Sequence, residues 1–326
     1  MIQPNELKLF LPMVIPNGVI SSTHKVWNIL SASHEGNRER VKELVEECPE
    51  LAYAQYNYTP PIHFAVREGH VELVNYLLKE GAHDPNYKIY PFQDSLLTIA
   101  QDRGHHQITK MLEQYYTDAS ACKFKGDNGE IHYKRSPVQQ EFEKAVNEND
   151  IAKTEILLKD DPQLCLDETF FWGEGILMMP AKGGHRELAE LLLHYGARVP
   201  GVLKWAQYYY FERYDMAAFL IESGMNPNVK SWHHVSLLHD MAQIGDINKA
   251  DLLLDHGADL NAIEEEYQST PLGLAARWGQ VEMVEFLIRE GADPNISGAP
   301  WSTPLSWSRK KGHTAIESLL TDAGAK

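Results

Sequence analysis

The sequence predicts an all-α solenoid, a stack of short helix pairs that share one apolar seam. The clearest pair lies in residues 269–295, where Pro271 opens one short apolar helix and Gly291 closes a second. Proline suits a first helical turn, which needs no N–H donor there, and glycine suits a helix end. Neither helix is long enough to be stable alone in water, so each needs a neighbour with the same apolar stripe. The pair therefore predicts copies of itself along the chain.

A glycine between the two helices marks each copy. Successive glycines are 33 to 35 residues apart in two runs, which are Gly36, Gly69 and Gly104, and Gly245, Gly279 and Gly312. Copies start with Thr-Pro-Leu at 270–272 and 303–305 or Pro-Ile-His-Phe-Ala at 61–65, and end with Gly-Ala-Asp at 257–259 and 291–293. A period near 33 with these starts and ends resembles the ankyrin repeat.

The resemblance implies nine repeats, taken in order at about 24–53, 56–87, 91–116, 138–166, 170–199, 200–228, 231–260 and 269–295, with a ninth ending at 326. Residues 1–23 are expected to be an amino-terminal extension that caps repeat 1. Residues 24–116 then hold repeats 1–3, and residues 138–326 hold repeats 4–9. The surplus residues 117–137 surround Asp127-Asn128-Gly129, a turn sequence typical of a β-hairpin, so we expect an inserted β-hairpin there.

Repeats 4 to 6 depart from the family pattern. Asn149 stands at the position of the inter-helix glycine in repeat 4. Pro180 replaces a family alanine in repeat 5, which predicts a short or kinked first helix. In repeat 6 the aromatic run 205–211 replaces the small residues of the first helix, and Glu212 replaces the glycine.

Composition narrows the class of function. The net charge of −16 argues against a nucleic-acid partner and leaves room for a basic or neutral protein partner. No apolar run reaches membrane-spanning length, so no membrane role is expected. Three widely spaced cysteines without a CxxC motif suit a reducing compartment, and we expect a cytoplasmic protein. No phosphate loop, nucleophile elbow or metal-binding histidine pattern appears, so no cofactor, metal or catalytic residue is predicted.

Ankyrin repeat proteins typically bind partners through the hairpin loop before the first helix and through the end of that helix. Applied to repeats 5 to 9, the resemblance implies a protein–protein interaction surface rich in aromatic residues, which are typical of binding hot spots. Trp172, Trp232, Tyr267 and Trp278 are expected to be exposed for binding. The residues that the resemblance implies are Phe171, Trp172, Glu174, Lys182, Tyr210, Phe211, Trp232, His233, Glu266, Tyr267, Arg277, Trp278, Trp301 and Lys310.

The preferred interpretation is a non-catalytic scaffold or adaptor that holds a protein or peptide in its concave groove. An alternative is a pocket for a small molecule or glycan, with hydrolase or lyase activity. There Glu174 and Glu266 would act as the carboxylate pair, His233 as proton carrier and Arg277 as anion contact. An enclosed aromatic pocket would favour the alternative, and a shallow groove would favour the scaffold.

Overall fold

The computed structural model describes residues 1–117, 123–124, 129–204 and 209–326. It divides into two compact units. The amino-terminal unit is Glu6–Lys134, and the carboxy-terminal unit combines Met1–Asn5 with Arg135–Lys326. Each unit is described by itself. None of the helices in the described ranges is both long and apolar enough to cross a lipid bilayer.

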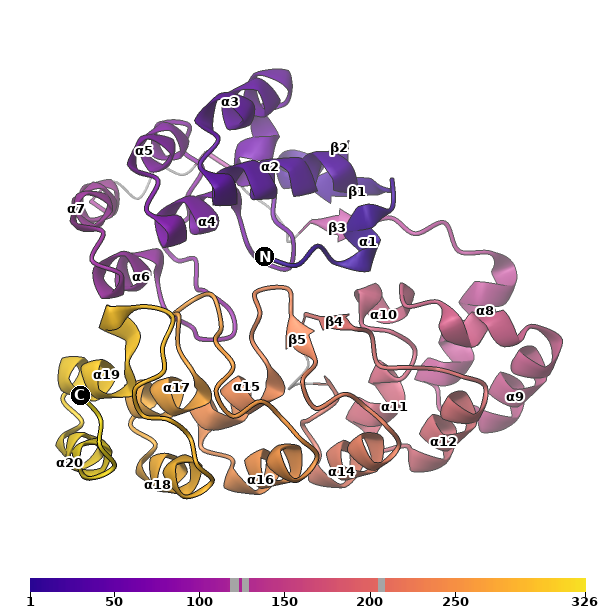
Figure 1. Cartoon of the computed structure of the whole chain (residues 1–326). Coiled ribbons are helices and arrows are strands. Elements are labelled where there is room, and N and C mark those ends of the chain that lie inside the picture. Colours follow the sequence, from indigo (N-terminus) through magenta and orange to yellow (C-terminus); the bar gives the residue numbers. More distant parts are fainter. Residues whose placement is uncertain (118–122, 125–128, 205–208) are drawn as a thin grey trace. The chain divides into compact units, whose positions relative to one another are not determined.

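The amino-terminal unit contains three helix pairs and a small sheet (Figure 1). Its helix pairs are α2 (Thr23–Glu35) with α3 (Arg38–Glu47), α4 (Pro61–Glu68) with α5 (Val71–Lys79), and α6 (Leu96–Asp102) with α7 (His106–Tyr115). The remaining elements are α1 (Asn5–Lys8), β1 (Pro12–Ile15), η1 (Pro16–Gly18), β2 (Val19–Ser22), η2 (Pro49–Tyr53) and β3 (Glu130–Ile131).

The carboxy-terminal unit continues the same design. Its helix pairs are α8 (Pro137–Asn147) with α9 (Ile151–Asp160), α11 (Met178–Gly183) with α12 (Arg186–His194), α15 (Leu237–Ile244) with α16 (Ile247–Asp255), α17 (Pro271–Trp278) with α18 (Val281–Arg289), and α19 (Pro304–Lys311) with α20 (Thr314–Asp322). Between them lie η3 (Pro162–Leu166), α10 (Phe170–Gly173), β4 (Val202–Leu203), α14 (Tyr214–Glu222), β5 (Lys230–Ser231) and η4 (Pro300–Ser302).

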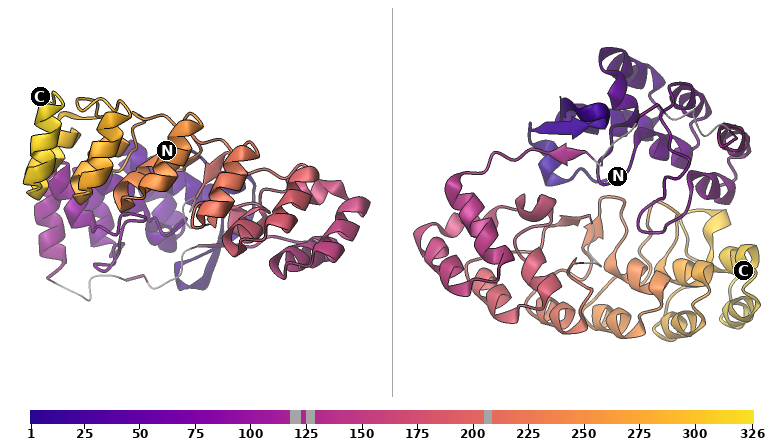
Figure 2. Two further views of the ribbon diagram at one scale, coloured as in Figure 1. Left: turned by 90° about the horizontal axis from the view of Figure 1, so that it is seen from below. Right: turned by 180° about the vertical axis from the view of Figure 1, so that it is seen from behind.

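Within the carboxy-terminal unit the helices form two layers. The first helices α15, α17 and α19 pack side by side, and the second helices α14, α16, α18 and α20 pack beside one another in a second layer, below the first in Figure 1 (see also Figure 2). The seam between the layers is apolar, with Leu274, Leu287 and Leu320 fully buried. The predicted all-α fold of stacked helix pairs is confirmed.

The inter-helix glycines recur for a reason that the structure makes explicit. Gly279 has φ +76° and caps α17, and a Cβ added to it would lie 2.8 Å from the ring of His313 in the next repeat. That ring nitrogen Nε2 lies 3.2 Å from the carbonyl oxygen of Arg277. In the amino-terminal unit the same contact joins each repeat to the preceding one: Nε2 of His70 lies 2.9 Å from the carbonyl oxygen of His34, and Nε2 of His105 lies 3.1 Å from that of Arg67.

The divergent repeats follow the sequence expectations where they are described. Asn149 takes the left-handed conformation of the missing glycine, with φ 56°. The helix that contains Pro180, α11, spans only Met178–Gly183, as the proline predicts. The predicted aromatic first helix of repeat 6 falls largely on residues 205–208, which lie outside the described residues.

A three-stranded antiparallel sheet accompanies the helices in the order β2-β1-β3. Strands β1 and β2 form a hairpin in the amino-terminal extension, and Met13 of β1 pairs with Ile131 of β3. The described strand of the 117–137 insert, β3, thus joins the extension. The turn of the predicted hairpin, centred on 127–129, lies mostly outside the described residues.

Candidate binding surface

In the described helix pairs of the carboxy-terminal unit a loop precedes each first helix, and these loops and helix ends define the candidate surface. We call the loop before a first helix its finger loop. In the helix pairs, we call the first helix the inner helix and the second the outer helix. The surface is described from repeat 5 onwards, because the predicted binding residues lie there.

The finger loop of repeat 5 is an unusual turn, α10. Its residues Phe171 and Trp172 have φ of 49° and 60°, and Gly173 follows with φ 81°. For a residue with a large side chain this left-handed conformation costs roughly 1–2 kcal/mol, because Cβ crowds the following carbonyl oxygen. Two such residues in succession are a strained turn that the surrounding structure must hold in place.

Contacts on both sides hold this turn. The ring of Phe170 packs edge-on against Phe142 at 5.6 Å between centroids, and Phe171 is buried. The amide of Phe171 donates to a carboxylate oxygen of Glu143 at 3.4 Å. From the finger loop of repeat 6, the Lys204 ammonium donates to the carbonyl oxygen of Trp172.

The consequence of this turn is an exposed indole. Trp172 keeps 68% of its surface accessible, whereas Phe170 and Phe171 beside it are buried. The prediction that Trp172 is exposed is confirmed. It stands on a backbone that its buried neighbours hold in place.

Four other predicted residues lie inside the protein instead. Glu174, Tyr210 and Phe211 are buried, as is Phe171. The Tyr210 hydroxyl donates to the carbonyl oxygen of Glu174, which ties the finger loop of repeat 5 to repeat 6. Burial, and then the charges of Glu174 and Glu168, raise the pKa of Tyr210 well above its usual value. These aromatics fill the space between the irregular repeats.

Trp232 and His233, in the finger loop of repeat 7, are also buried. Trp232 has 2% of its surface accessible, so the expectation that it is exposed is wrong. Its ring lies 4.2 Å from that of His233, and its carbonyl oxygen accepts the amide of Ile2 at 3.0 Å. His233 Nδ1 lies 2.6 Å from an oxygen of Glu266 in the next finger loop.

The finger loop of repeat 8 is built around a buried carboxylate. Glu264 accepts the amides of Glu266, Tyr267 and Ser269 at 2.6–3.1 Å. Burial, followed by the charge of Glu266, raises the pKa of Glu264 to about 7, against the effect of those amides. The loop is therefore ordered by its own acidic residues, and its carboxylates face inward.

The aromatic residues of repeats 8 and 9 surround one arginine. The Arg277 guanidinium carbon lies 3.9 Å from the Tyr267 ring centroid, 4.1 Å from that of Trp278 and 5.2 Å from that of Trp307. Tyr267 is fully buried, so its predicted exposure is wrong, and Arg277 is buried as well. Trp278 and Trp301 are half-buried, and Trp301 packs edge-on against Trp307 at 5.8 Å.

The carboxylates proposed for catalysis do not face an open surface. Glu174 and Glu266 are 1% and 0% accessible. Glu266 is paired with His233, and Arg277 lies against the three aromatic rings. The sequence placed all four at binding positions by register, but the structure assigns them to packing within and between finger loops.

Two basic residues lie in the repeat of Trp172 and in the next repeat. Lys182 lies in the last turn of the inner helix α11, is exposed, and has its Nζ 5.4 Å from the ring centroid of Tyr209. Lys204 reaches the Trp172 carbonyl oxygen from repeat 6. The sequence analysis selected Lys182 by register but passed over Lys204. Lys204 could have been identified in the sequence because it directly precedes the aromatic run 205–211.

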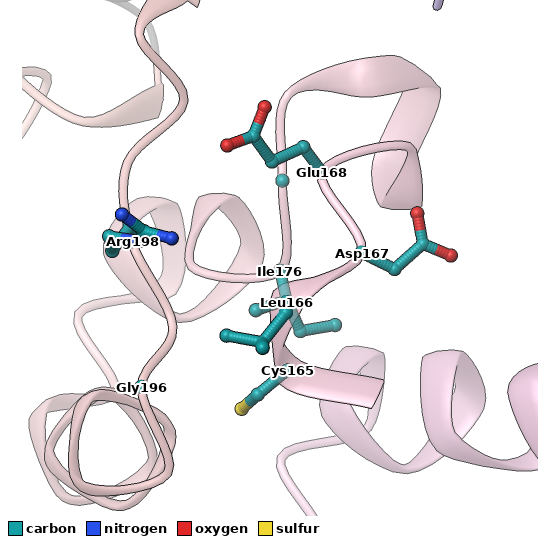
Figure 3. Close-up of a pocket in the computed structure, with 8 residues that line it drawn as sticks. Cys165, Leu166, Asp167, Glu168, Ile176, Gly196 and Arg198 are labelled. Atoms are coloured by element: carbon teal, nitrogen blue, oxygen red, sulfur yellow. The ribbon is translucent and has the colours of Figure 1, made fainter. Parts of the chain in front are cut away.

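A shallow hollow lies beside this finger loop, between η3, residues 175–176 and residues 196–198 (Figure 3). Glu168 and Arg198 stand on opposite sides of it, and the buried Cys165 lies at its floor (Figure 3). The Cys165 thiol donates to the carbonyl oxygen of Leu192 at 3.4 Å, and burial raises its pKa to about 12. A thiol that stays protonated is a poor nucleophile, so this cysteine is structural.

The loop between η3 and α10 also holds two distant parts of the chain. The Asn5 side chain donates to Glu168 at 2.7 Å. Arg135 donates to Asp167 at 2.8 Å and to the Thr169 hydroxyl at 2.9 Å. Asn5 and Arg135 are the two residues that flank the amino-terminal unit in the sequence, so one loop fixes the chain where it leaves and where it returns.

Comparison with known proteins adds family matches and partial relatives. A family model described as ankyrin repeats, three copies, matches residues 233–298, and one described as ankyrin repeat matches residues 58–89. The ARF GTPase-activating protein Git of Drosophila melanogaster is 36% identical over 86 residues, which are 26% of this chain and 12% of that protein. The ARF GTPase-activating protein GIT2 of Mus musculus is 30% identical over 112 residues, which are 34% of this chain and 16% of that protein.

A probable E3 ubiquitin-protein ligase, XBOS32 of Oryza sativa subsp. japonica, is 28% identical over 191 residues. These residues cover 52% of this chain and 38% of the ligase. In all three cases the match spans well under half of the relative's length.

Proposed function

Because the chain is an ankyrin repeat protein, we propose that it is a non-catalytic scaffold or adaptor that binds a protein or peptide partner on the finger loops and inner-helix ends of repeats 5 to 8. The observation that carries the proposal is the exposed Trp172 on its strained turn. A large apolar side chain held in solvent by a costly backbone conformation has no packing role of its own, and tryptophan is enriched at interface hot spots.

The other predicted residues take different parts in this proposal. Trp278 and Trp301 are half-buried and retain surface for a partner. The buried residues Trp232, His233 and Glu266 act as supports that fix the shape of the finger loops. A rigid, internally packed set of loops favours a preformed surface, which lowers the entropy lost on binding.

The relatives match this chain only in part and do not indicate its activity. The matched proteins are named as ARF GTPase-activating proteins and a probable ubiquitin ligase, and the match spans only 12% to 38% of each. We therefore propose binding for this chain and assign it neither activity. The net charge of −16 favours a basic or neutral partner protein over nucleic acid. The free thiols Cys48 and Cys165 are consistent with a cytoplasmic location.

The test uses the chain as bait with a matched control. Tyr214, at the start of the outer helix α14, is 52% accessible and lies off the finger loops. We expect native-lysate proteins that bind the unaltered chain and Tyr214→Ala to be lost from Trp172→Ala, measured by quantitative mass spectrometry. If Trp172→Ala retains the same proteins at the same levels, the proposed surface is wrong.

A further inference from the structure

The chain supplies its own occupant for part of the finger-loop surface. Residues 1–5, which we call the strap, belong to the carboxy-terminal unit although they precede the amino-terminal one. The backbone amide of Ile2 donates to the carbonyl oxygen of Trp232 at 3.0 Å, in the finger loop of repeat 7. The side chain of Asn5 donates to Glu168 at 2.7 Å, in the loop that leads into the turn α10 of repeat 5. The strap is therefore held at two finger loops of the same unit.

The strap crosses the array as an extended peptide. Residues 1–4 form neither helix nor strand, and Pro4 is buried. Residues 2 to 5 span at most about 11 Å when fully extended, and packed helices lie about 8–10 Å apart. A segment attached at repeat 7 and, through two side chains, at repeat 5 therefore passes the finger loop of repeat 6.

The strap ends in the loop that carries the exposed indole. Glu168, which accepts the Asn5 side chain, is followed four residues later by Trp172. The indole keeps 68% of its surface accessible with the strap in place. A partner segment that packs on Trp172 and continues along the finger loops towards repeat 7 would therefore meet the strap.

We propose that the strap is an exchangeable intramolecular ligand of the finger loops, and that a partner protein packs on Trp172 and lays an extended, uncharged segment in the place of the strap. This inference rests on the proposed function and adds the chemistry of the bound segment and a control on its access. The chemistry follows from the strap, whose side chains from Met1 to Asn5 carry no charge. The segment that replaces it must offer a backbone donor to the Trp232 carbonyl oxygen and a neutral donor to Glu168.

The indole has a defined part in this exchange. A tethered segment acts at an effective concentration in roughly the millimolar range, which a free segment must overcome. A partner segment that makes the same two hydrogen bonds as the strap gains no advantage from them. The contact with Trp172, a residue type enriched at hot spots, must supply the difference. Removal of the strap should therefore tighten partner binding, whereas removal of the indole should abolish it.

The first experiment supplies the strap as a separate peptide. In the strap variant, the full chain carries Ile2→Gly, Gln3→Ser, Pro4→Gly and Asn5→Gly. Its tryptophans are replaced by 5-fluorotryptophan, and the Trp232 fluorine resonance is assigned with Trp232→Phe. We expect a synthetic peptide of residues 1–8, at about 1 mM, to move this resonance towards its position in the unaltered chain. The same peptide should leave the unaltered chain unchanged, and a peptide of scrambled sequence should move neither.

The second experiment tests competition with a partner segment. Dodecapeptides are selected by phage display on the strap variant and counter-selected against the same variant with Trp172→Ala. We expect the surviving peptides to contain few charged residues. A fluorescein-labelled survivor should bind about tenfold more tightly to the strap variant than to the unaltered chain, measured by fluorescence anisotropy.

A milder variant and a matched control accompany this measurement. Ile2→Pro removes the amide donor and Asn5→Ala removes the side-chain donor, so the two together should shift affinity in the same direction as the strap variant. Asn248→Ala, at an exposed position on the outer helix α16, should leave affinity within about twofold of the unaltered chain. Circular dichroism checks that each variant is folded.

The outcomes separate this inference from the proposed function. If the peptide of residues 1–8 does not move the Trp232 resonance, or the scrambled peptide moves it equally, the strap is not a ligand and the binding function stands. Survivors that are rich in charged residues, or that bind both chains equally, would overturn the exchange and also leave the function intact. A selection in which no peptide depends on Trp172 would overturn the proposed surface and the inference together.

Discussion

At the scale of single residues, the ring of His313 explains why Gly279 cannot carry a side chain. Gly279→Ala would lose folding stability for two reasons: the backbone is left-handed at φ +76°, and the added Cβ would lie 2.8 Å from the His313 ring. Gly312 has the same backbone, with φ +77°, but nothing within 4 Å of an added Cβ. We expect Gly279→Ala to be less stable than Gly312→Ala by about 1–3 kcal/mol in urea unfolding. Equal losses of unfolding free energy in the two variants would show that the His313 ring moves aside without cost.

His239 provides a pH-dependent prediction at the same scale. Its Nε2 lies 3.0 Å from the Ala262 carbonyl oxygen and its Nδ1 2.8 Å from the Ser236 hydroxyl, and burial lowers its pKa from 6.5 to about 4. Between these values the unfolded chain binds the proton and the folded one does not. The stabilisation is therefore complete above pH 6.5 and is lost as pH falls to 4, by up to about 3 kcal/mol.

The measurement compares urea unfolding of the unaltered chain and His239→Gln from pH 7.5 to 4. The difference in unfolding free energy should shrink as pH falls. Glu264 has a raised pKa and acts in the opposite direction, but it is present in both proteins and cancels in the comparison. If the difference in unfolding free energy between the unaltered chain and His239→Gln stays constant from pH 7.5 to 4, the His239 imidazole is not held neutral.

At the scale of elements, the turn α10 makes a prediction about its backbone that is separate from binding. Trp172 has φ 60°, a conformation that glycine adopts without the Cβ penalty. Trp172→Gly should therefore be more stable than Trp172→Ala by about 1 kcal/mol. Ile156 is exposed within the helix α9, and there the order of stability should reverse: Ile156→Ala should be more stable than Ile156→Gly by a similar amount. Both pairs are measured by denaturant unfolding, and the same order at both sites would exclude strain in the turn.

The elements that the sequence predicted well are those fixed by local pattern. Helix pairs follow from apolar spacing and from glycine or asparagine at turns that need a left-handed residue, as Gly279 and Asn149 show. The short α11 follows from Pro180 alone. These features depend on a few neighbouring residues, so a single sequence contains them.

The exposure of side chains on the finger loops could not be predicted from local sequence pattern. Trp172, Trp232 and Tyr267 occupy related positions, yet only Trp172 is exposed. Tyr267 is buried because Trp278, Trp307 and Arg277 from other elements close around it. Such exposure depends on partners distant in sequence, and a repeat register gives only the position of the backbone.

At the scale of the whole molecule, Met1–Asn5 belong to the carboxy-terminal unit although they precede the amino-terminal one. The Ile2 amide, which donates to Trp232, should therefore exchange its hydrogen together with Ser231 of β5. Val41→Ala in α3 should speed exchange at Leu44 and leave Ile2 and Ser231 unchanged, measured by native-state hydrogen exchange with NMR. Faster exchange at Ile2 in this variant would assign the segment to the other unit.

The loop that fixes Asn5 and Arg135 has a consequence for the order of events during synthesis. Residues 1–5 leave the ribosome before Glu6–Lys134, but their contacts at Glu168 and Trp232 emerge more than 150 residues later. Domains fold largely as they are made, so Glu6–Lys134 can complete its own packing during this interval. The contact of Asn5 must therefore wait until Glu168 has been made, and the contact of Ile2 until Trp232 has been made.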